Sequence, residues 1–526
     1  MLFNSYLFIL VFLPIAVVGF YAIGSKGAQR MAILWLFLVS LFFYGWWNPV
    51  YLWLISASLL FNYTIGLALS KYLHPSLRKC ILTGGIAANV VALGYFKYAS
   101  FIVTNLHVAL GTNYHLEKII LPLAISFFTF EQIAYVVDVY RGETEQYEFP
   151  RYCIFVIFFP QLIAGPIVHH NEMLPQFAKD KTYRLNPENL AVGITIFTIG
   201  LFKKVVLADR LAEYATPVFD VAGTGAPLTF FETWFGALAY TFQLYFDFSG
   251  YSDLAIGTAR MFGILLPLNF HSPYKANNII EFWRRWHITL SRFLKDYLYV
   301  PLGGNRKGEV RRSINIMLTM LLGGLWHGAA WNFALWGTLH GFYLLVNQAW
   351  RKLSGSLGRD LKKTSMCGRG ASWLITFTAV VVGWVFFRAE SLDGAINMLR
   401  GMSGQQGFAL PSHYLRVLNK IFNLGDYVAG LGLVFDNRVF VGGGFSVGSV
   451  GLLVVAALSA WYGPNTQQFM IRYRPALEIY RGEIKAWRFS GLRWENSRAW
   501  ALGVALTFAL SLFHLTRISE FLYFNF

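Results

Sequence analysis

Uncharged stretches long enough to cross a membrane recur along this chain, and residues 31–70 are the clearest case. They contain no Asp, Glu, Lys or Arg. As one helix they would extend about 60 Å, roughly twice the apolar thickness of a bilayer. The stretch must therefore fold back on itself, and the pair Asn48-Pro49 near its middle predicts the turn.

Basic residues at the two ends of this hairpin indicate its orientation. Lys26 and Arg30 precede it, and Lys71, Arg78 and Lys79 follow it. Both ends therefore lie on one side of the membrane, which the positive-inside rule assigns to the cytoplasm.

Residues 5–24 form the first apolar run. No Lys or Arg precedes this run, which is too long for a cleaved signal segment and is followed directly by more membrane segments. We therefore expect a retained first helix. The orientation of the hairpin then places the N-terminus on the outer, periplasmic side.

Further apolar segments predict an all-α, polytopic integral membrane protein with about 11–13 transmembrane or re-entrant helices. One of them, residues 153–168, contains FFPQLIAGPI, whose two prolines and glycine are typical of a re-entrant or broken helix. Such backbone is tolerated at membrane depth only where protein or a cavity surrounds it. The segments are 80–96, 98–111, 119–137, 153–168, 190–208, 230–248, 251–268, 313–332, 333–350, 372–389, 446–461 and 499–515.

Three segments are too polar for this pattern. Residues 277–312 alternate Trp, Phe, Leu and Tyr with Arg and Lys at helical spacing, which predicts an interfacial amphipathic helix on the cytoplasmic side. Residues 351–369 and 472–498 are basic loops, which we also expect in the cytoplasm.

Composition agrees with a membrane protein. Hydrophobic residues make up 56% of the 526 residues and charged residues 13%, about half the share in a soluble protein. The net charge of +17 is accounted for by short cytoplasmic loops, membrane lipids and an anionic substrate, so it does not indicate nucleic acid. Cys80, Cys153 and Cys367 fit no disulfide framework or zinc motif and predict structural thiols.

Two histidines interrupt the apolar stretch GGLWHGAAWNFALWGTLHG, residues 323–341. An ionisable residue at this depth either forms a packing hydrogen bond between helices or has a function. Burial disfavours the charged imidazolium, so a functional His327 is neutral near pH 7 and can take a proton from a hydroxyl. Gly324 and Gly328 leave room beside the ring for another backbone or for a substrate.

His340 lies thirteen residues after His327. On one continuous helix this spacing corresponds to about 20 Å of rise and about 220° of rotation, so the two rings could not ligate one metal ion. The spacing also matches no zinc motif, and we predict no metal site. A helix break between the two histidines would reopen the question.

His287 lies in WRRWHITLSRFLKD, within the amphipathic segment. It is either part of a solvated basic surface or a second active-site histidine with cationic neighbours. The guanidinium groups of Arg284 and Arg285 suit phosphate oxygens, and Arg292 and Lys295 add positive charge. Lipid phosphates would satisfy these side chains as well.

Further polar candidates lie in otherwise apolar or Gly-rich surroundings. The turn PLGGNRKG carries Asn305 and Arg306, which could bind an anionic group, although it lacks the ending of a P-loop. Asp247 in FDFSGYSDLA and Glu131 in FFTFEQIAY are carboxylates that need a partner when buried. For Asp247 a proton relay and a hydrogen bond between helices are equally compatible with the sequence, whereas we favour the hydrogen bond for Glu131.

Four motifs, in this order, resemble the membrane-bound O-acyltransferase (MBOAT) family and its bacterial polysaccharide branch: FFPQLIAGPI, QLYFDFSGYSDLAIG, FWRRWHITLSRFLKDYLYVPLGGNR and LLGGLWHGAAWNFALWGTLHG. Four motifs in order are far more specific than any one histidine. The resemblance covers at least residues 1–350, which would form the core of a single membrane domain over residues 1–526. Residues 351–526 match no motif and are expected to contribute transmembrane helices and basic loops.

The resemblance implies roles for individual residues. His327, with Trp326 beside it, would be the buried hallmark histidine and general base, and His287 the second residue of the pair, which steadies the acyl oxygen or the base. The helices would surround a funnel open to the cytoplasm and a narrow tunnel to the outer face. The candidates for substrate or donor binding are Arg284, Arg285, Asn305, Arg306, Trp326 and Asp247.

The resemblance also implies a pathway. The acyl donor would be acetyl-CoA, with an acyl carrier protein as the alternative, and no cofactor would stay bound. The acetyl group would cross the bacterial inner membrane for O-acetylation of an exopolysaccharide such as alginate. The partners would be a periplasmic or membrane-anchored acetyltransferase and a polysaccharide synthesis and export complex.

Two other functions use the same features. A transporter or flippase also needs intramembrane ionisable residues and broken helices, and a scaffold of a polymer-synthesis complex needs no chemistry. The pairing of WRRWHITLS with GLWHG favours the acyltransferase over both.

Overall fold

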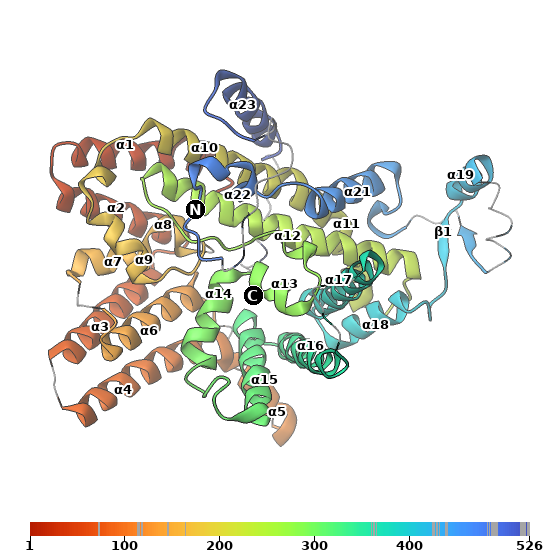
Figure 1. The fold of residues 1–526 in the computed structure, drawn as a ribbon, viewed down its shortest axis with the longest axis horizontal. Helices are drawn as coiled ribbons and strands as arrows, with labels where there is room; N and C mark the ends of the chain where they lie inside the picture. Colours follow the sequence, from red (N-terminus) through yellow and green to blue (C-terminus); the bar gives the residue numbers. More distant parts are fainter. Residues whose placement is uncertain are drawn as a thin grey trace.

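The computed structural model is almost entirely helical (Figure 1). It describes residues 1–526 except 72–73, 113–115, 117–118, 145–146, 164, 359, 361–362, 364, 423–426, 428–429, 431, 437–439, 481, 483, 485–492, 516–521 and 523–526. Part of the predicted basic loops 351–369 and 472–498 therefore lies outside the described residues.

The helices of the N-terminal half are α1 (Leu13–Gly24), α2 (Gln29–Gly45), α3 (Tyr51–Lys71), α4 (Pro75–Leu93), α5 (Ala99–Leu110), α6 (Ile125–Arg141), α7 (Phe149–Ile157), α8 (Phe159–Leu162), α9 (His170–Phe177), α10 (Pro187–Phe202), α11 (Asp209–Gly223) and α12 (Phe230–Met261). The elements that follow are α13 (Ile279–Arg285), α14 (Ile288–Leu294), α15 (Gly308–His327), α16 (Trp331–Ser356), α17 (Met366–Arg388), α18 (Leu392–Met402), β1 (Ala409–Pro411), α19 (His413–Phe422), β2 (Val434–Asp436), α21 (Val447–Trp461), α22 (Thr466–Phe469) and α23 (Arg498–Phe513). Strands β1 and β2 form one short parallel pair.

The predicted hairpin over residues 31–70 is confirmed. Helix α2 ends at Gly45 and α3 begins at Tyr51, so the chain turns at Asn48-Pro49. Among the described residues, four helical stretches are long and apolar enough to cross a membrane, and four shorter apolar helices accompany them. The protein is thus an all-α polytopic membrane protein, while the number of complete crossings stays a prediction. The four long stretches are Tyr51–Lys71, Pro75–Leu110, Pro187–Gly223 and Met366–Arg388.

Helix α12 runs through the middle of the molecule and is buried along nearly its whole length (Figure 1). Helix α10 packs against it through glycines. A Cβ atom on Gly193 would lie 2.7 Å from the carbonyl oxygen of Gly257, and one on Gly200 would lie 2.6 Å from that of Gly250. The two backbones are therefore in contact, as is common where small residues line a helix interface in a membrane.

Buried ion pairs join the same two helices. The π-helical turn η4 (Lys203–Ala208) places the ammonium of Lys204 2.6 Å from Asp247 on α12, and 2.9 Å from Asp209. The adjacent Lys203 lies 2.6 Å from Asp253. Asp247 thus has the partner that a buried carboxylate requires, and that partner comes from a neighbouring helix.

The FFPQLIAGPI region is a broken helix, as its prolines predict. Helix α7 ends at Ile157, α8 is a single turn, and the described residues between α8 and α9 form no helix. The described residues of this region are almost all buried. Glu131 on α6 accepts a hydrogen bond from the backbone N–H of Val168 at 3.5 Å, so it joins a helix to this loop rather than to a second helix.

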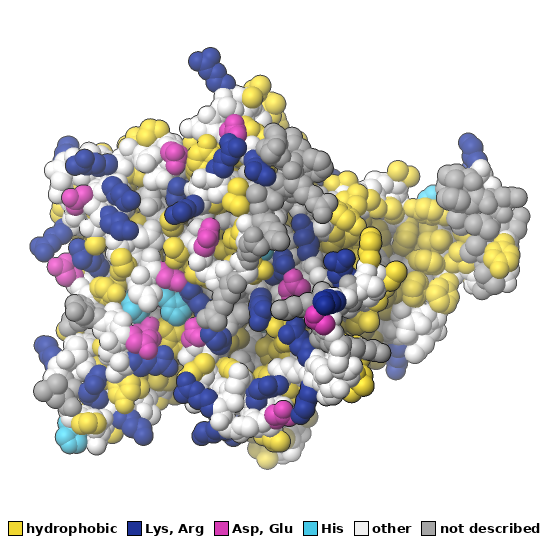
Figure 2. All heavy atoms as spheres, in the orientation of Figure 1, with side chains coloured by type: hydrophobic (Ala, Val, Ile, Leu, Met, Phe, Trp, Pro, Cys, Tyr) yellow, Lys and Arg dark blue, Asp and Glu magenta, His cyan; other side chains and the backbone are white. Residues whose placement is uncertain are grey.

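The prediction of one amphipathic helix over residues 277–312 was wrong in its continuity. Two seven-residue helices, α13 and α14, are separated at Trp286 and His287. His287 has a positive φ of 43°, which no α-helix accommodates. Figure 2 shows a Lys- and Arg-rich face, on which basic side chains are spread over most of the view.

Candidate active site

His327 lies at a break between two helices. It is the last residue of α15, Gly328 is extended, and α16 begins at Trp331. The continuous helix assumed for the spacing of His327 and His340 is therefore absent. The described residues nevertheless contain no group of three or more His, Cys, Asp or Glu side chains that could hold a metal ion.

Glycines set the position of His327. A Cβ atom on Gly324 would lie 2.3 Å from the carbonyl oxygen of Phe333 and 2.9 Å from the Cα of Gly337 on α16. A Cβ atom on Gly328 would lie 2.1 Å from the ring of Phe333. We expected these glycines to leave room either for another backbone or for a substrate. In the structure the space beside them is filled by another backbone and an aromatic ring.

The structure brings the two predicted catalytic histidines together. The ring centroids of His287 and His327 are 6.3 Å apart, and the rings are inclined at 60°. His287 is fully buried and His327 is 3% exposed. His287 lies outside the spanning helices, and burial lowers the pKa of its imidazole to about 3. It is therefore neutral at physiological pH.

Aromatic rings enclose His327. The centroids of Trp326, Trp336 and Phe387 lie 5.0, 5.2 and 5.2 Å from that of His327. Phe387 belongs to α17, so the part of the chain after residue 350 supplies one wall of the site, which the sequence motifs did not indicate.

His340 belongs to the same aromatic cluster. Its ring lies 4.9 Å from that of Trp336, which separates it from His327. The indole N–H of Trp283 on α13 donates a hydrogen bond to His340 Nδ1 at 3.2 Å. His340 therefore lies behind Trp336 and not beside the pair His287 and His327.

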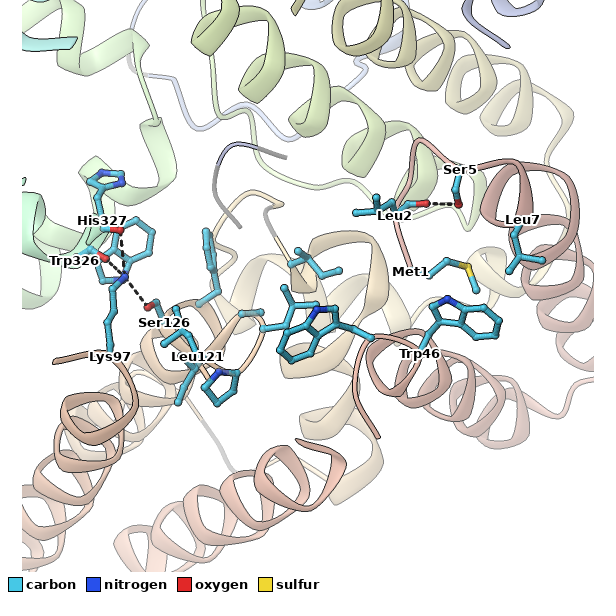
Figure 3. Close-up of a pocket in the computed structure, with 17 residues that line it drawn as sticks. Met1, Leu2, Ser5, Leu7, Trp46, Lys97, Leu121, Ser126, Trp326 and His327 are labelled. Carbon is cyan, nitrogen blue, oxygen red and sulfur yellow. Dashed lines mark hydrogen bonds between the residues drawn. The ribbon is translucent and has the colours of Figure 1, made fainter. Parts of the chain in front are cut away.

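A cavity of about 630 Å³ ends at His327 (Figure 3). At its inner end Lys97, Ser126, Trp326 and His327 lie together, and Trp46 lies toward the other end with residues of the N-terminal segment. The lining residues are Met1, Leu2, Ser5, Leu7, Trp46, Trp47, Lys97, the run 121–127, Ile163, Trp326 and His327.

Lys97 is a site residue that the sequence reasoning missed. Its ammonium lies 2.5 Å from the carbonyl oxygen of Trp326, and 3.4 Å from both the carbonyl oxygen of His327 and the hydroxyl of Ser126. It belongs to the π-helical turn η2 (Gly94–Tyr98) within the apolar stretch Pro75–Leu110. The available signal was a single lysine inside a membrane-spanning helix, which indicates function by default.

The predicted donor-binding residues lie elsewhere. Arg284 is exposed, and Arg285 pairs with Glu281 at 2.7 Å. Asn305 accepts a hydrogen bond from Tyr299 and is exposed like Arg306. Of the predicted set only Trp326 and His327 line the 630 Å³ cavity.

A second, smaller cavity of about 270 Å³ lies between the amphipathic segment and the helices α15 and α16. Lys295 and Tyr299 line it from the amphipathic segment, and Gln348 from α16. It reaches Trp283, whose indole binds His340. The two cavities thus approach the aromatic cluster through different elements.

Comparison with known proteins identifies the family. The membrane-bound O-acyltransferase family matches residues 85–383. The peptidoglycan O-acetyltransferase of Helicobacter pylori is 45% identical over 436 residues, which cover 78% of this chain and 81% of that protein. The probable alginate O-acetylase AlgI of Pseudomonas putida is 38% identical over the full length of both chains. A teichoic acid D-alanyltransferase of Bacillus subtilis is 28% identical over 41% of this chain and 56% of that protein. This chain therefore belongs to the membrane-bound O-acyltransferase family and is an acyltransferase.

Proposed function

We propose that this protein transfers an acetyl group from a cytoplasmic thioester to a hydroxyl group on the outer side of the bacterial inner membrane, for O-acetylation of a cell-envelope polysaccharide. The acceptor oxygen forms a bond to the acetyl carbon, the carbon–sulfur bond breaks, and the hydroxyl proton ends on the released thiol. The observation that carries the proposal is the facing pair of His287 and His327, with a cavity that ends at His327.

His327 is the general base in this proposal. Its ring is buried among aromatic side chains, which disfavours the charged imidazolium and leaves the ring able to accept a proton. An acceptor hydroxyl that enters the 630 Å³ cavity would meet His327 at the inner end. General-base catalysis by such a group contributes about 10²–10⁴-fold in rate.

The larger cavity is the path for the acceptor. Its lining includes Trp46 and Trp47, which belong to the turn between α2 and α3. The basic residues at the far ends of these two helices assign the opposite side to the cytoplasm. The cavity therefore opens on the periplasmic side, where the N-terminus also lies in this proposal.

The donor arrives from the cytoplasmic side. Acetyl-CoA and an acetylated carrier protein both carry phosphate, and the exposed guanidinium groups of Arg284 and Arg306 are suited to phosphate oxygens. Arg285 and Asn305 would contribute to the same surface. Asp247 is paired with Lys204 inside the protein, which explains its burial without any contact to a substrate.

The acceptor polymer is a polysaccharide of the cell envelope in this proposal, because relatives are named for O-acetylation of peptidoglycan and of alginate. A periplasmic or membrane-anchored acetyltransferase that works with a polysaccharide synthesis and export complex would complete the transfer. Residues 1–350 and the helices after them act together, since Phe387 contacts His327.

The test is thiol release from [14C]acetyl-CoA by the purified protein in lipid nanodiscs, with acetylated acyl carrier protein as a second donor. We expect His327→Ala to lower the rate about 100-fold or more, while His74→Ala, at an exposed histidine of the same chain, keeps the wild-type rate. Wild-type activity in His327→Ala would overturn the proposal. If the enzyme is active with acetylated acyl carrier protein and not with acetyl-CoA, the carrier protein is the donor.

A further inference from the structure

Asn269 is a buried amide beside the histidine pair. It lies in the irregular segment after α12 and is 0% exposed. Its side-chain oxygen accepts hydrogen bonds from the Thr289 hydroxyl at 2.9 Å and from the Thr289 backbone N–H at 3.3 Å. The same oxygen lies 3.1 Å from His287 Nδ1.

The partners of Thr289 identify this atom as oxygen. A backbone N–H can only donate, so the amide atom that faces it must be an acceptor. The Thr289 hydroxyl accepts a hydrogen bond from the backbone N–H of Ile167 at 3.1 Å and donates its own hydrogen to the same Asn269 oxygen. Rotation of the amide by 180° would place its NH₂ group against the backbone N–H of Thr289, which can only donate. The ring nitrogen that faces this oxygen, His287 Nδ1, must therefore carry the hydrogen.

The backbone holds His287 in this position. The Ile288 N–H donates to the backbone carbonyl of Asn269 at 2.9 Å, and the His271 N–H donates to that of Arg285 at 2.9 Å. Between these two bonds His287 adopts its positive φ of 43°. Such strained conformations persist only where the surroundings enforce them, and they cluster at active sites.

We propose that Asn269 is a positioning residue that fixes His287 as the Nδ1–H tautomer and leaves Nε2 as a hydrogen-bond acceptor. His287 Nε2 is buried and has no hydrogen-bond partner among the described residues. A neutral imidazole with hydrogen on Nδ1 has only a lone pair on Nε2. His287 can therefore receive a proton or accept a hydrogen bond through Nε2, and it cannot hold the acyl oxygen by donation.

This assignment chooses between the two roles expected for His287. It rests on the proposed function, because it leaves His287 the task of supporting the base, His327, and removes the task of binding the acyl oxygen. Donors suited to that oxygen are the indole N–H groups of Trp326 and Trp336, which are buried without hydrogen-bond partners in the described part of the chain. Both rings contact His327.

The groups that face His287 are few. His327 on α15 is the titratable neighbour, and Lys97 reaches the backbone carbonyl of His327 from η2. The rings of Phe248 on α12 and Phe270 are uncharged and lie 4.8 and 6.3 Å from the ring of His287. A charge placed at residue 269 would therefore act directly on His287.

Three variants separate positioning from a role in loop structure. Asn269→Asp keeps the acceptor oxygen and adds a negative charge. Asn269→Leu removes the acceptor at similar volume. Thr289→Val removes one of the three donors and leaves the contact of Asn269 with His287 in place.

The test is ¹⁵N nuclear magnetic resonance of the full-length protein with ¹⁵N-labelled histidine in lipid, with the His287 signals assigned by their loss in His287→Gln. We expect Nδ1 protonated and Nε2 unprotonated in the wild type and in Thr289→Val, at every pH from 8 down to 5. In Asn269→Asp the carboxylate stabilises the imidazolium and raises the pKa of His287 by about one unit or more, so the protonated ring gains population toward pH 5.

Protonated Nε2 in the wild-type protein would overturn the proposal, whatever the enzymatic activity. An unchanged tautomer in a folded Asn269→Leu would overturn it as well. If Asn269→Leu fails to fold, the spectra of the wild type and of Asn269→Asp still test the tautomer of His287. A further readout is kcat with acetyl-CoA, which we expect to fall at least tenfold in Asn269→Leu and to stay within threefold in Thr289→Val. If the wild type shows the expected tautomer but no acetyl transfer, the proposed function fails and the tautomer assignment stands.

Discussion

A methyl group at Gly324 is expected to disable the enzyme without any change to a polar group. A Cβ atom on Gly324 would lie 2.3 Å from the carbonyl oxygen of Phe333 and 2.9 Å from the Cα of Gly337. Ordinary contacts between such atoms are about 3.5 Å, so α15 and α16 must separate by about 1 Å at this point. His327 lies three residues further along α15, at its end.

The consequence of this separation is larger for activity than for stability. Overpacking of this kind costs about 1–3 kcal/mol, which a large membrane protein can tolerate. A displacement of about 1 Å at the reacting groups can lower the rate about 100-fold. We therefore expect Gly324→Ala to lower kcat about 100-fold and to lower the melting temperature only modestly.

Acetyl release from [14C]acetyl-CoA and a thermal unfolding curve on the same preparation measure both effects. Gly355→Ala is the matched control on α16, because no heavy atom lies within 4 Å of a Cβ atom built there. Wild-type kcat in Gly324→Ala, with the melting temperature unchanged, would show that the contact between the two helices does not position His327.

Three further substitutions test individual contacts. Lys97→Met removes the side chain that binds the backbone carbonyl at the end of α15 and should lower kcat about tenfold. Lys79→Met, at an exposed position, should keep the wild-type kcat. Equal kcat values for the two variants would exclude Lys97 from the site. His340→Phe leaves the half-buried indole N–H of Trp283 without an acceptor, at a cost of about 1 kcal/mol, but should keep far more activity than His327→Ala in the acetyl-release assay. Lys204→Met leaves the buried carboxylate of Asp247 and the half-buried carboxylate of Asp209 without their partner and should destabilise the fold by about 3–5 kcal/mol. This loss would be seen as a lower melting temperature, and an unchanged melting temperature would contradict a structural role for the cluster.

The parts of the fold that follow from bilayer dimensions could be predicted from sequence. A forty-residue apolar stretch has to turn, and Asn48-Pro49 was the only strong turn signal within it. The same holds for the break in the FFPQLIAGPI region, since two prolines remove backbone donors from any helix there.

The break at His287 could not be predicted, because the interactions that cause it come from distant residues. The sequence pattern of 277–312 is helical throughout, yet two backbone hydrogen bonds between this segment and the residues Asn269 and His271 hold His287 in a left-handed conformation. Tertiary hydrogen bonds here override helical propensity.

The pairing of His287 with His327 came from family resemblance, since their forty-residue separation carries no geometric information across two helix breaks. Lys97 was missed because it belongs to none of the four motifs and two of its three partners are backbone carbonyls, which leave no trace in sequence. The aromatic residues of α17 were missed because they belong to none of the four motifs. Their contact with His327 depends on how distant helices pack together, which the sequence does not show.

The central claim is that His327 drives acetyl transfer across the membrane, and its sidedness can be measured directly. Proteoliposomes with the Lys- and Arg-rich face outward would receive [14C]acetyl-CoA outside. The partner that would complete the transfer to the polymer is absent, so water in the lumen accepts the acetyl group. We predict that labelled acetate accumulates in the lumen with the wild type and not with His327→Ala. Label that stays outside, or that enters equally with His327→Ala, would contradict the account.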